Sequence, residues 1–140
     1  MPDNVQAPSF VDTNIWLYAF IEGEVPDKTN KSRQIILECE PIVSSQVVNE
    51  VCVNLIKKAG FDEERIRQLI DAFYEKYEVI EQDQSTLLVA SQLRQKYSLS
   101  FWDSLVIASA LQAQVETLYS EDVQHGLIIE DSLKIINPLL

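Results

Sequence analysis

The 140-residue chain has few of the residue types on which several common classes of protein depend. It contains two cysteines, one histidine, three glycines and five prolines. Cys39 and Cys52 make no disulfide framework, and neither belongs to a CxxC or cysteine–histidine metal motif. The small share of glycine and proline excludes collagen-like and low-complexity chains. We therefore expect a folded protein in a reducing, cytoplasmic setting.

The chain also lacks a long apolar run and an early basic segment. Its longest uncharged apolar block, Leu105 to Leu111, falls far short of the roughly 20 residues that a membrane-spanning helix needs. The first basic residue is Lys28, so the basic region that opens a secretory signal peptide is missing. We expect neither membrane association nor secretion.

Basic residues are scarce throughout. Eleven Lys and Arg residues stand against 22 Asp and Glu residues, which gives a formal net charge of −11. Proteins that hold nucleic acids mainly through phosphates are usually basic, because neutralising phosphates releases counterions. Composition alone therefore argues against a nucleic-acid partner. It favours a cationic partner, a bound metal or, as the simplest explanation, solubility.

The residues that are present predict one α/β domain over residues 1–140. The length suits a single domain, and short apolar runs alternate with helical patterns, which is typical of a parallel sheet. The first expected strand ends with residues 9–11. The other expected strands are Pro41–Val43, Glu78–Ile80, Val115–Tyr119 and Leu133–Ile136.

Helical patterns fill the segments between these strands. Residues 22–30 are polar and are interpreted as a connection. Ser44 or Ser45 can cap a helix that Gly60 ends. A helix that begins at Ser100 is apolar almost all round from Leu105 onward, which predicts that it is buried. Further helices are expected through Trp16 to Phe20, from Lys31 to Glu38, from Asp62 onward and from Gln84 to Tyr97.

Two acids stand directly after expected strands. Asp12 follows Val11, and Asp122 follows the strand that ends at Tyr119. Ligands of open α/β sheets bind in the crevice beyond the carboxyl ends of the strands. We therefore expect these two carboxylates at a binding site.

Two further acids have a structural and a functional interpretation. Asp103 completes a Ser-x-x-Asp capping box with Ser100, yet it lies in line with Ile107 on a helix with little polar face. A carboxylate that points toward buried surroundings needs partners or a cation. Glu50 lies at the edge of an apolar helix face beside Val51. From spacing alone, a boundary glutamate is its simpler interpretation.

A convergence of these four acids would favour metal chemistry. Carboxylates that crowd together repel one another unless a cation is present. A site of oxygen ligands without histidine or cysteine suits Mg²⁺ or Mn²⁺ better than zinc. Such ions lower the pKa of a bound water, orient a phosphate and stabilise the leaving oxygen, which equips the site for phosphodiester hydrolysis.

The short sequences around these acids, taken together, resemble the PIN-domain nucleases, and most closely the VapC-type toxins of toxin–antitoxin pairs. The four acids occur in the order and spacing of that family, over nearly the whole chain. The matching segments are Val11-Asp12-Thr13-Asn14, Val48-Asn49-Glu50-Val51, Phe101-Trp102-Asp103-Ser104-Leu105-Val106-Ile107-Ala108 and Tyr119-Ser120-Glu121-Asp122.

The resemblance implies a three-layer α/β/α PIN-like domain with a mainly parallel central sheet of four to five strands. It implies a Mg²⁺- or Mn²⁺-dependent endoribonuclease that cleaves single-stranded RNA as the toxin of a type II pair. It further implies an antitoxin with a basic tail and a homodimer. By carry-over the catalytic and metal-binding acids, here called the acidic quartet, are Asp12, Glu50, Asp103 and Asp122. The supporting polar residues are Thr13 or Asn14, and Ser120.

Other functions fit the sequence less well. Phosphatases of the haloacid-dehalogenase type need a second acid two residues after the first, where this chain has Asn14. Phosphoacceptor receiver domains need adjacent acids near the N-terminus and a lysine after the last core strand. The alternative that stays open is a PIN-like module that binds RNA or protein without cutting.

Aromatic and basic residues near these segments have two interpretations each. Trp16 and Trp102 are more often core or dimer contacts at such positions, although exposed aromatics can stack on bases. His125, the single histidine, is interpreted as incidental. Four basic residues are ordinary helix-surface charges or a rim that contacts phosphates: Arg65, Arg67, Arg94 and Lys96.

Overall fold

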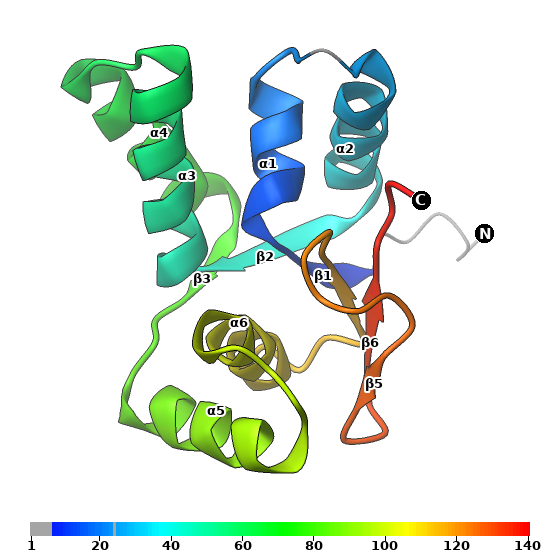
Figure 1. Ribbon diagram of the computed structural model, residues 1–140. Helices are drawn as coiled ribbons and strands as arrows, with labels where there is room; N and C mark the ends of the chain where they lie inside the picture. Colours follow the sequence, from blue (N-terminus) through cyan, green and yellow to red (C-terminus); the bar gives the residue numbers. More distant parts are fainter. Residues whose placement is uncertain (1–6, 24) are drawn as a thin grey trace.

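The computed structural model describes residues 7–23 and 25–140, and its centre is a six-stranded sheet in the order β3-β2-β1-β4-β6-β5 (Figure 1). All neighbouring strands run parallel except β5 and β6, which pair antiparallel. The strands are β1 (Pro8–Val11), β2 (Glu40–Ser44), β3 (Glu78–Ile80), β4 (Thr117–Tyr119), β5 (Ile128–Ile129) and β6 (Leu133–Ile136).

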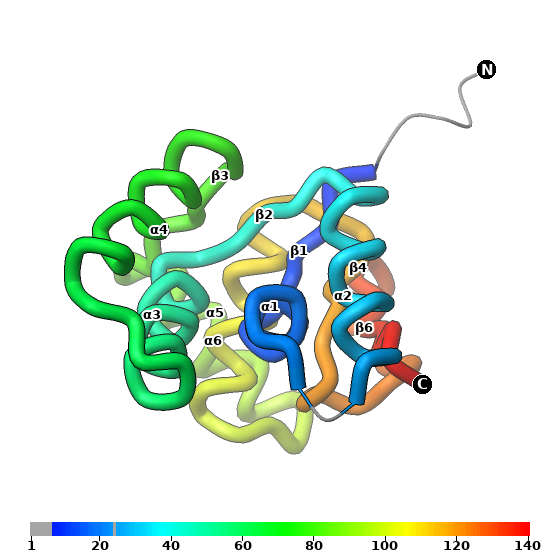
Figure 2. Tube along the Cα trace, turned by 90° about the horizontal axis from the view of Figure 1, so that it is seen from above, coloured from blue at the N-terminus to red at the C-terminus, as the bar shows by residue number. Residues whose placement is uncertain are grey.

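Helices cover both faces of this sheet, so the predicted three-layer α/β/α arrangement is confirmed. Helices α1 to α4 lie on one side of the sheet, and α5 and α6 lie on the other (Figure 1). The view from above shows α1 standing between the α3–α4 pair and α2 (Figure 2). The helices are α1 (Thr13–Phe20), α2 (Pro26–Glu38), α3 (Ser45–Ala59), α4 (Glu63–Lys76), α5 (Gln84–Lys96) and α6 (Phe101–Gln112).

Side-chain caps fix where several of the helices begin. The hydroxyl of Ser44 accepts a hydrogen bond from the backbone N–H of Val47, so Ser44 rather than Ser45 caps α3. Asp62 caps α4 in the same way. Gly60 ends α3 with a φ of 67°, a left-handed conformation that glycine adopts without the steric penalty of a Cβ atom.

The structure corrects two expectations. The sheet has six strands rather than four to five, because Ile128–Ile129 pairs with β6 through a short hairpin in which Glu130 and Asp131 both have positive φ. The connection predicted over residues 22–30 is shorter, because α2 begins at Pro26. Proline suits the first turn of a helix, where its missing N–H leaves no bond unmade. Residues 1–6 of the expected domain and residue 24 of the expected connection lie outside the described residues.

The core lies between the sheet and its two helical layers. Residues 105–110 of α6 are all buried, as the apolar pattern predicts. Trp16 of α1 is 1% exposed, and its indole N–H donates to the carbonyl of Val11 at 3.0 Å. This bond ties α1 to the end of β1, directly beside Asp12. No helix in the described ranges is long and apolar enough to cross a membrane.

Candidate active site

Parallel pairing of β1 with β4 brings Asp12 and Asp122 to the same edge of the sheet. Val11 is paired with Tyr119, and the backbone N–H of Asp12 donates to the carbonyl of Tyr119 at 3.0 Å. Each strand then turns away at its carboxyl end. The two acids that follow these strands in the sequence are therefore neighbours in space, as predicted.

Ser120 links the two chain segments. Its hydroxyl, which is fully buried, donates to Asp12 Oδ2 at 2.8 Å. The same oxygen accepts hydrogen bonds from the backbone N–H groups of Asp122 at 3.2 Å and Val123 at 3.3 Å. One side chain thereby sets the position of the Asp12 carboxylate relative to the loop that carries Asp122.

Asp12 is the most buried of the four acids, with 5% of its surface exposed. Burial raises its pKa from 3.8 to about 6, and the nearby charges of Asp122 and Glu50 add to the rise. Hydrogen bonds from the Thr13 N–H and the Ser120 hydroxyl oppose it. A carboxylate so placed is ionised at neutral pH at a free-energy cost that a nearby cation would remove.

Glu50 and Asp103 approach the same place from two different helices. Burial raises the pKa of Glu50, and the charges of Asp122 and Asp103 raise it further, while a hydrogen bond from Gln46 lowers it. The pKa of Asp122 is likewise raised, first by burial and then by the charges of Asp103 and Glu121. The four predicted acids therefore lie close enough to act on one another electrostatically.

The hydrogen bonds that cap α6 do not involve the carboxylate of Asp103. The Ser100 hydroxyl accepts the N–H of Asp103 at 3.1 Å. The return bond of a capping box, from the Ser100 N–H to the Asp103 carboxylate, is not formed between these described residues. The cap thus engages the backbone of Asp103, while its carboxylate, in the first turn of α6, makes no hydrogen bond within the cap.

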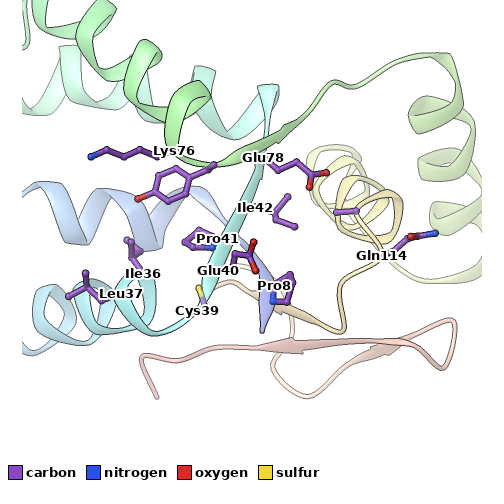
Figure 3. Close-up of a pocket in the computed structure, with 12 residues that line it drawn as sticks. Pro8, Ile36, Leu37, Cys39, Glu40, Pro41, Ile42, Lys76, Glu78 and Gln114 are labelled. Carbon is purple, nitrogen blue, oxygen red and sulfur yellow. The ribbon is translucent and has the colours of Figure 1, made fainter. Parts of the chain in front are cut away.

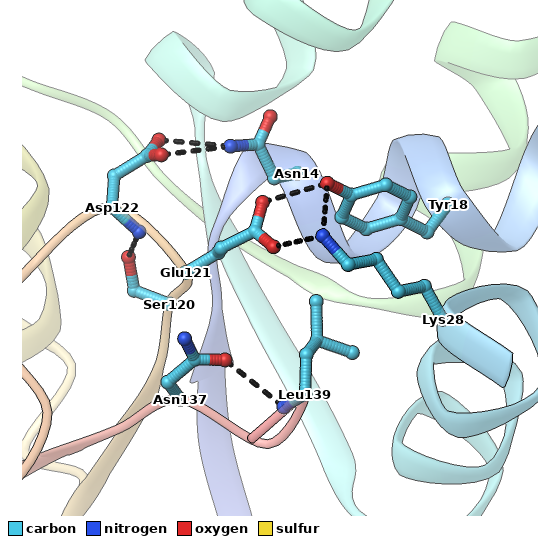
Figure 4. Close-up of polar contacts among 8 residues, drawn as sticks. All are labelled: Asn14, Tyr18, Lys28, Ser120, Glu121, Asp122, Asn137 and Leu139. Atoms are coloured by element: carbon cyan, nitrogen blue, oxygen red, sulfur yellow. Dashed lines mark hydrogen bonds and ion pairs between the residues drawn. The ribbon is translucent and has the colours of Figure 1, made fainter. Parts of the chain in front are cut away.

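Asn14 and Thr13 stand beside the acids, at the start of α1. The Asn14 amide donates to both carboxylate oxygens of Asp122, at 2.9 and 3.0 Å (Figure 4). Thr13 is 6% exposed, and its hydroxyl has no hydrogen-bond partner among the described residues. An unpartnered buried hydroxyl next to Asp12 is a polar atom that a bound ligand or hydrated ion could satisfy.

Glu121, the immediate neighbour of Asp122, is held outside this group of acids. Tyr18 donates to one of its carboxylate oxygens at 2.7 Å, and Lys28 binds the other at 2.9 Å (Figure 4). Burial alone would raise the pKa of Glu121, but these bonds lower it below its usual value. The cluster joins α1, α2 and the loop after β4, so it anchors the loop that carries Asp122.

The sequence model of the PIN domain matches residues 9–126, from the first strand to just beyond the last of the four acids.

The chain belongs to the PIN domain family.

Solved structures share this PIN fold at low sequence identity. A toxin–antitoxin complex from Klebsiella pneumoniae has a TM-score of 0.69 and 20% identity, and the match covers 93% of this chain and 97% of that one. VapC20 of Mycobacterium tuberculosis, a toxin that cleaves the sarcin–ricin loop, has a TM-score of 0.67 and 16% identity over 81% and 89% of the two chains. FitAcB from Neisseria gonorrhoeae has a TM-score of 0.66 and 18% identity over 93% and 97%. No curated protein sequence matches this chain.

The acids of this PIN domain offer oxygen ligands alone, the donor set that Mg²⁺ and Mn²⁺ prefer. Within the described part of the chain, no three acidic, histidine or cysteine side chains are already grouped closely enough to hold an ion together. Mg²⁺ does not require such a group, because it usually keeps several waters and takes one or two carboxylates plus substrate phosphate. The buried Asp12, its two acidic neighbours and the unpartnered Thr13 hydroxyl therefore fit a hydrated divalent ion.

Cavities lie on both sides of the acids. One of about 500 Å³ includes Glu50 and Trp102, and one of about 280 Å³ includes Asp103 and Asp122. A third cavity, of about 530 Å³, lies at the opposite end of the sheet, where Pro8, Glu40 and Glu78 begin their strands (Figure 3). Ligands of α/β sheets bind at the carboxyl ends of strands, so the first two cavities are the ones relevant to the acids.

The aromatic, histidine and basic residues singled out in the sequence have different roles in the structure. Trp16 is a core residue, whereas Trp102 is 64% exposed. His125 accepts a hydrogen bond from the backbone N–H of Asn137 at 2.9 Å, which gives it a structural role. Among the basic residues, Lys96 is paired with Glu130 at 2.7 Å.

The four basic residues of the suggested phosphate rim do not form one surface. Arg65 and Arg67 are on α4, on the opposite side of the sheet from α5 with Arg94 and Lys96 (Figure 1). Arg94 donates to the Ser104 hydroxyl at 2.7 Å and stacks on the ring of Phe101. It is thereby fixed against the first turns of α6.

Residues outside the acidic quartet also hold carboxylates in place, and the sequence did not predict them. Tyr18 and Lys28 fix Glu121, and Gln46 donates to Glu50. No local pattern marks Tyr18 and Lys28, because their partner Glu121 is 103 and 93 positions away in the sequence. A polar side chain near a strand end was the one usable signal, and it applies to Gln46 alone.

Proposed function

We propose that this PIN domain is a Mg²⁺- or Mn²⁺-dependent endoribonuclease that cleaves single-stranded RNA. The observation that carries the proposal is the mutual electrostatic influence of four carboxylates, two after β1 and β4 and two on α3 and α6. Among them Asp12 is buried, and its pKa is raised by burial and by Asp122 and Glu50. Membership of the PIN domain family supports it. The similar fold of VapC20, a toxin that cleaves the sarcin–ricin loop, also supports the proposal.

In this proposal Asp12, Asp103 and Asp122 hold the divalent ion. When bound, the ion lowers the pKa of a water molecule, orients the scissile phosphate and stabilises the leaving oxygen. Glu50 would help to hold the ion or would orient the attacking water. Thr13 is available as a polar partner beside Asp12.

Ser120 and Asn14 orient the carboxylates. Ser120 fixes one oxygen of Asp12, and Asn14 holds Asp122 with a bond to each oxygen. The Asn14 amide therefore fixes the orientation in which the Asp122 carboxylate would be presented to an ion.

We further propose that the chain is the toxin of a type II toxin–antitoxin pair. Its solved structural relatives include toxin–antitoxin complexes. A net charge of −11 attracts a basic peptide and speeds its association. An antitoxin tail with Arg or Lys would pair with Asp12, Asp103 and Asp122, and its inhibition would be competition with the metal for those carboxylates.

A homodimer is part of this proposal. Apolar side chains are exposed on the helices near the acids, among them Val53 of α3, Leu88 of α5 and Phe101 of α6. Assemblies of identical chains most often have two-fold symmetry. Two copies joined near these helices would place their acidic sites on a shared surface.

The test is cleavage of a labelled single-stranded RNA by the purified chain. We expect cleavage with Mg²⁺ or Mn²⁺, none with EDTA, and a loss of roughly 100-fold or more for Asp12→Asn, because metal assistance contributes several kcal/mol. Asp71→Asn, an exposed aspartate on α4, is the matched control and should retain full activity. Full cleavage in EDTA, or by the Asp12→Asn variant, would contradict the proposal. RNA binding without any cleavage would favour the non-catalytic alternative.

A further inference from the structure

The cavity of about 500 Å³ beside Glu50 has a composition unlike the acidic site that it adjoins. It is lined by Ser45, Gln46, Asn49, Glu50, Gln82 and Trp102. These residues come from the start of α3, the segment after β3 and the first turn of α6. Glu50 is thus the single charged residue among three carboxamides, a hydroxyl and an indole. The volume lies within the roughly 300–1,000 Å³ of small-ligand sites.

Trp102 presents its ring at this cavity rather than to the core. It is 64% exposed, although it lies one residue before Asp103 on a helix whose following turns are buried. The ring of Phe101 contacts it edge to face, with 5.2 Å between ring centroids, and Arg94 in turn stacks on Phe101 at 4.5 Å. The indole is therefore supported by neighbouring side chains at the rigid start of a helix.

The carboxamides of the cavity are ordered by hydrogen bonds that reach Glu50. The Gln82 amide donates to Gln46 Oε1 at 2.8 Å and to the Ser109 hydroxyl at 3.0 Å. Gln46 then donates to Glu50. A carboxamide carries both donors and an acceptor, the groups that recognise the edges of nucleobases. The cavity thus combines an aromatic face, ordered amides and a direct connection to the acidic site.

We propose that this cavity binds one nucleobase of single-stranded RNA, stacked on Trp102, with its edge toward Asn49 and the carbonyl oxygen of Gln82. The inference rests on the proposed function, because it places the base next to the phosphate held at the acids. It also accounts for RNA binding by a chain of net charge −11. Stacking on an aromatic side chain and bonds from amides need no basic residue.

The first test measures the dissociation constant of a fluorescent ten-nucleotide single-stranded RNA, by anisotropy in a Ca²⁺ buffer. Base–aromatic stacking strengthens binding roughly 5- to 150-fold, so Trp102→Ala should weaken binding at least about 5-fold. Trp102→Phe should retain most of the affinity. Leu37→Ala removes a side chain that is 74% exposed on α2, outside the cavity, and should leave the dissociation constant unchanged.

The second test examines which base is preferred. Asn49 is exposed, so Asn49→Ala removes one carboxamide without disturbing the Gln82–Gln46–Glu50 chain of bonds. We expect it to change the ratio of dissociation constants among oligo(A), oligo(C) and oligo(U). Unchanged ratios in this variant, together with an unchanged affinity in Trp102→Ala, would overturn the inference.

Three other outcomes are distinguishable. If Trp102→Ala binds RNA normally but has a lower molar mass by light scattering, Trp102 belongs to an interface between copies and the inference is wrong. If the wild-type chain neither binds nor cleaves RNA, the proposed function itself fails, and the inference with it. Metal-dependent cleavage by the wild type with an unaffected Trp102→Ala variant overturns the base site alone.

Discussion

Replacement of Asp12 by asparagine should remove activity and at the same time stabilise the metal-free fold. The Asp12 carboxylate is buried, and its pKa is about 6 against an ordinary value of 3.8. Because one pKa unit corresponds to ~1.36 kcal/mol, this difference means that ionised Asp12 destabilises the folded state by about 3 kcal/mol at neutral pH. The asparagine side chain carries no charge, so the Asp12→Asn substitution relieves that penalty.

Hydrogen bonding reduces the expected gain. Asp12 accepts bonds from the Thr13 N–H and the Ser120 hydroxyl. An asparagine oxygen can keep one of them, while its amide must face the other group, at a loss of ~1 kcal/mol. We therefore expect Asp12→Asn to raise the free energy of unfolding by about 2 kcal/mol at pH 7. At roughly 2–4 °C per kcal/mol, the Tm should rise by about 4–8 °C.

The pH dependence follows from the direction of the pKa change. A raised folded-state pKa means that the folded protein binds the Asp12 proton more tightly than the unfolded chain does. This contribution to stability is fully present below about pH 4 and is lost as the pH rises toward 6. The advantage of Asp12→Asn should accordingly be absent near pH 4 and reach its full size above pH 6.

Urea unfolding in EDTA between pH 4 and 8 measures this difference directly. Glu121→Gln supplies a control of opposite sign, because the bonds from Lys28 and Tyr18 lower the pKa of Glu121 and make its charge stabilising at neutral pH. That variant should lose stability at pH 7. An Asp12→Asn variant that is less stable than wild type at pH 7, or a difference independent of pH, would refute the reasoning.

Three further predictions concern the serine link, the antitoxin and assembly. Ser120→Ala removes the donor to Asp12 and the acceptor for two backbone N–H groups, so urea unfolding should show a loss of ~1–3 kcal/mol, and cleavage should weaken; unchanged stability would contradict the assigned role. Association with a basic antitoxin tail, followed by stopped flow, should slow as monovalent salt rises, and excess Mg²⁺ should weaken inhibition; indifference to both would exclude competition for the carboxylates. Light scattering at micromolar concentration should give a dimer of about 32 kDa, twice the 16.0 kDa chain, and a species of 16 kDa alone would exclude it.

The sequence predicted the parts of the fold and site that depend on local patterns. The apolar run before Asp12 predicts a strand that ends where the helical pattern of the next segment begins. The apolar circumference of α6 predicts its burial, and Ser100 predicts its start. Each of these signals is contained within a few neighbouring residues, and each is confirmed.

The parts that were missed depend on contacts between distant residues. Strand β5 has two residues and forms because Ile129 pairs with Leu133 of β6. A segment of two residues is too short for its sequence pattern to predict a strand. The polar composition of residues 22–30 indicated a connection, so the start of α2 at Pro26 was not predicted. Proline is compatible with the first helical position. The bonds of Lys28 and Tyr18 to Glu121 span 93 and 103 positions. Such bonds appear only once the strands are assembled.

The most direct test of the central claim is the binding of Mn²⁺ to the acidic quartet, followed by electron paramagnetic resonance of free Mn²⁺. We expect the wild-type chain to bind the ion and Asp12→Asn, Asp103→Asn and Asp122→Asn each to weaken that binding at least tenfold. Asp71→Asn, the exposed control on α4, should bind as the wild type does. Equal Mn²⁺ binding by the wild type and all three quartet variants would contradict the claim that these carboxylates hold the catalytic metal.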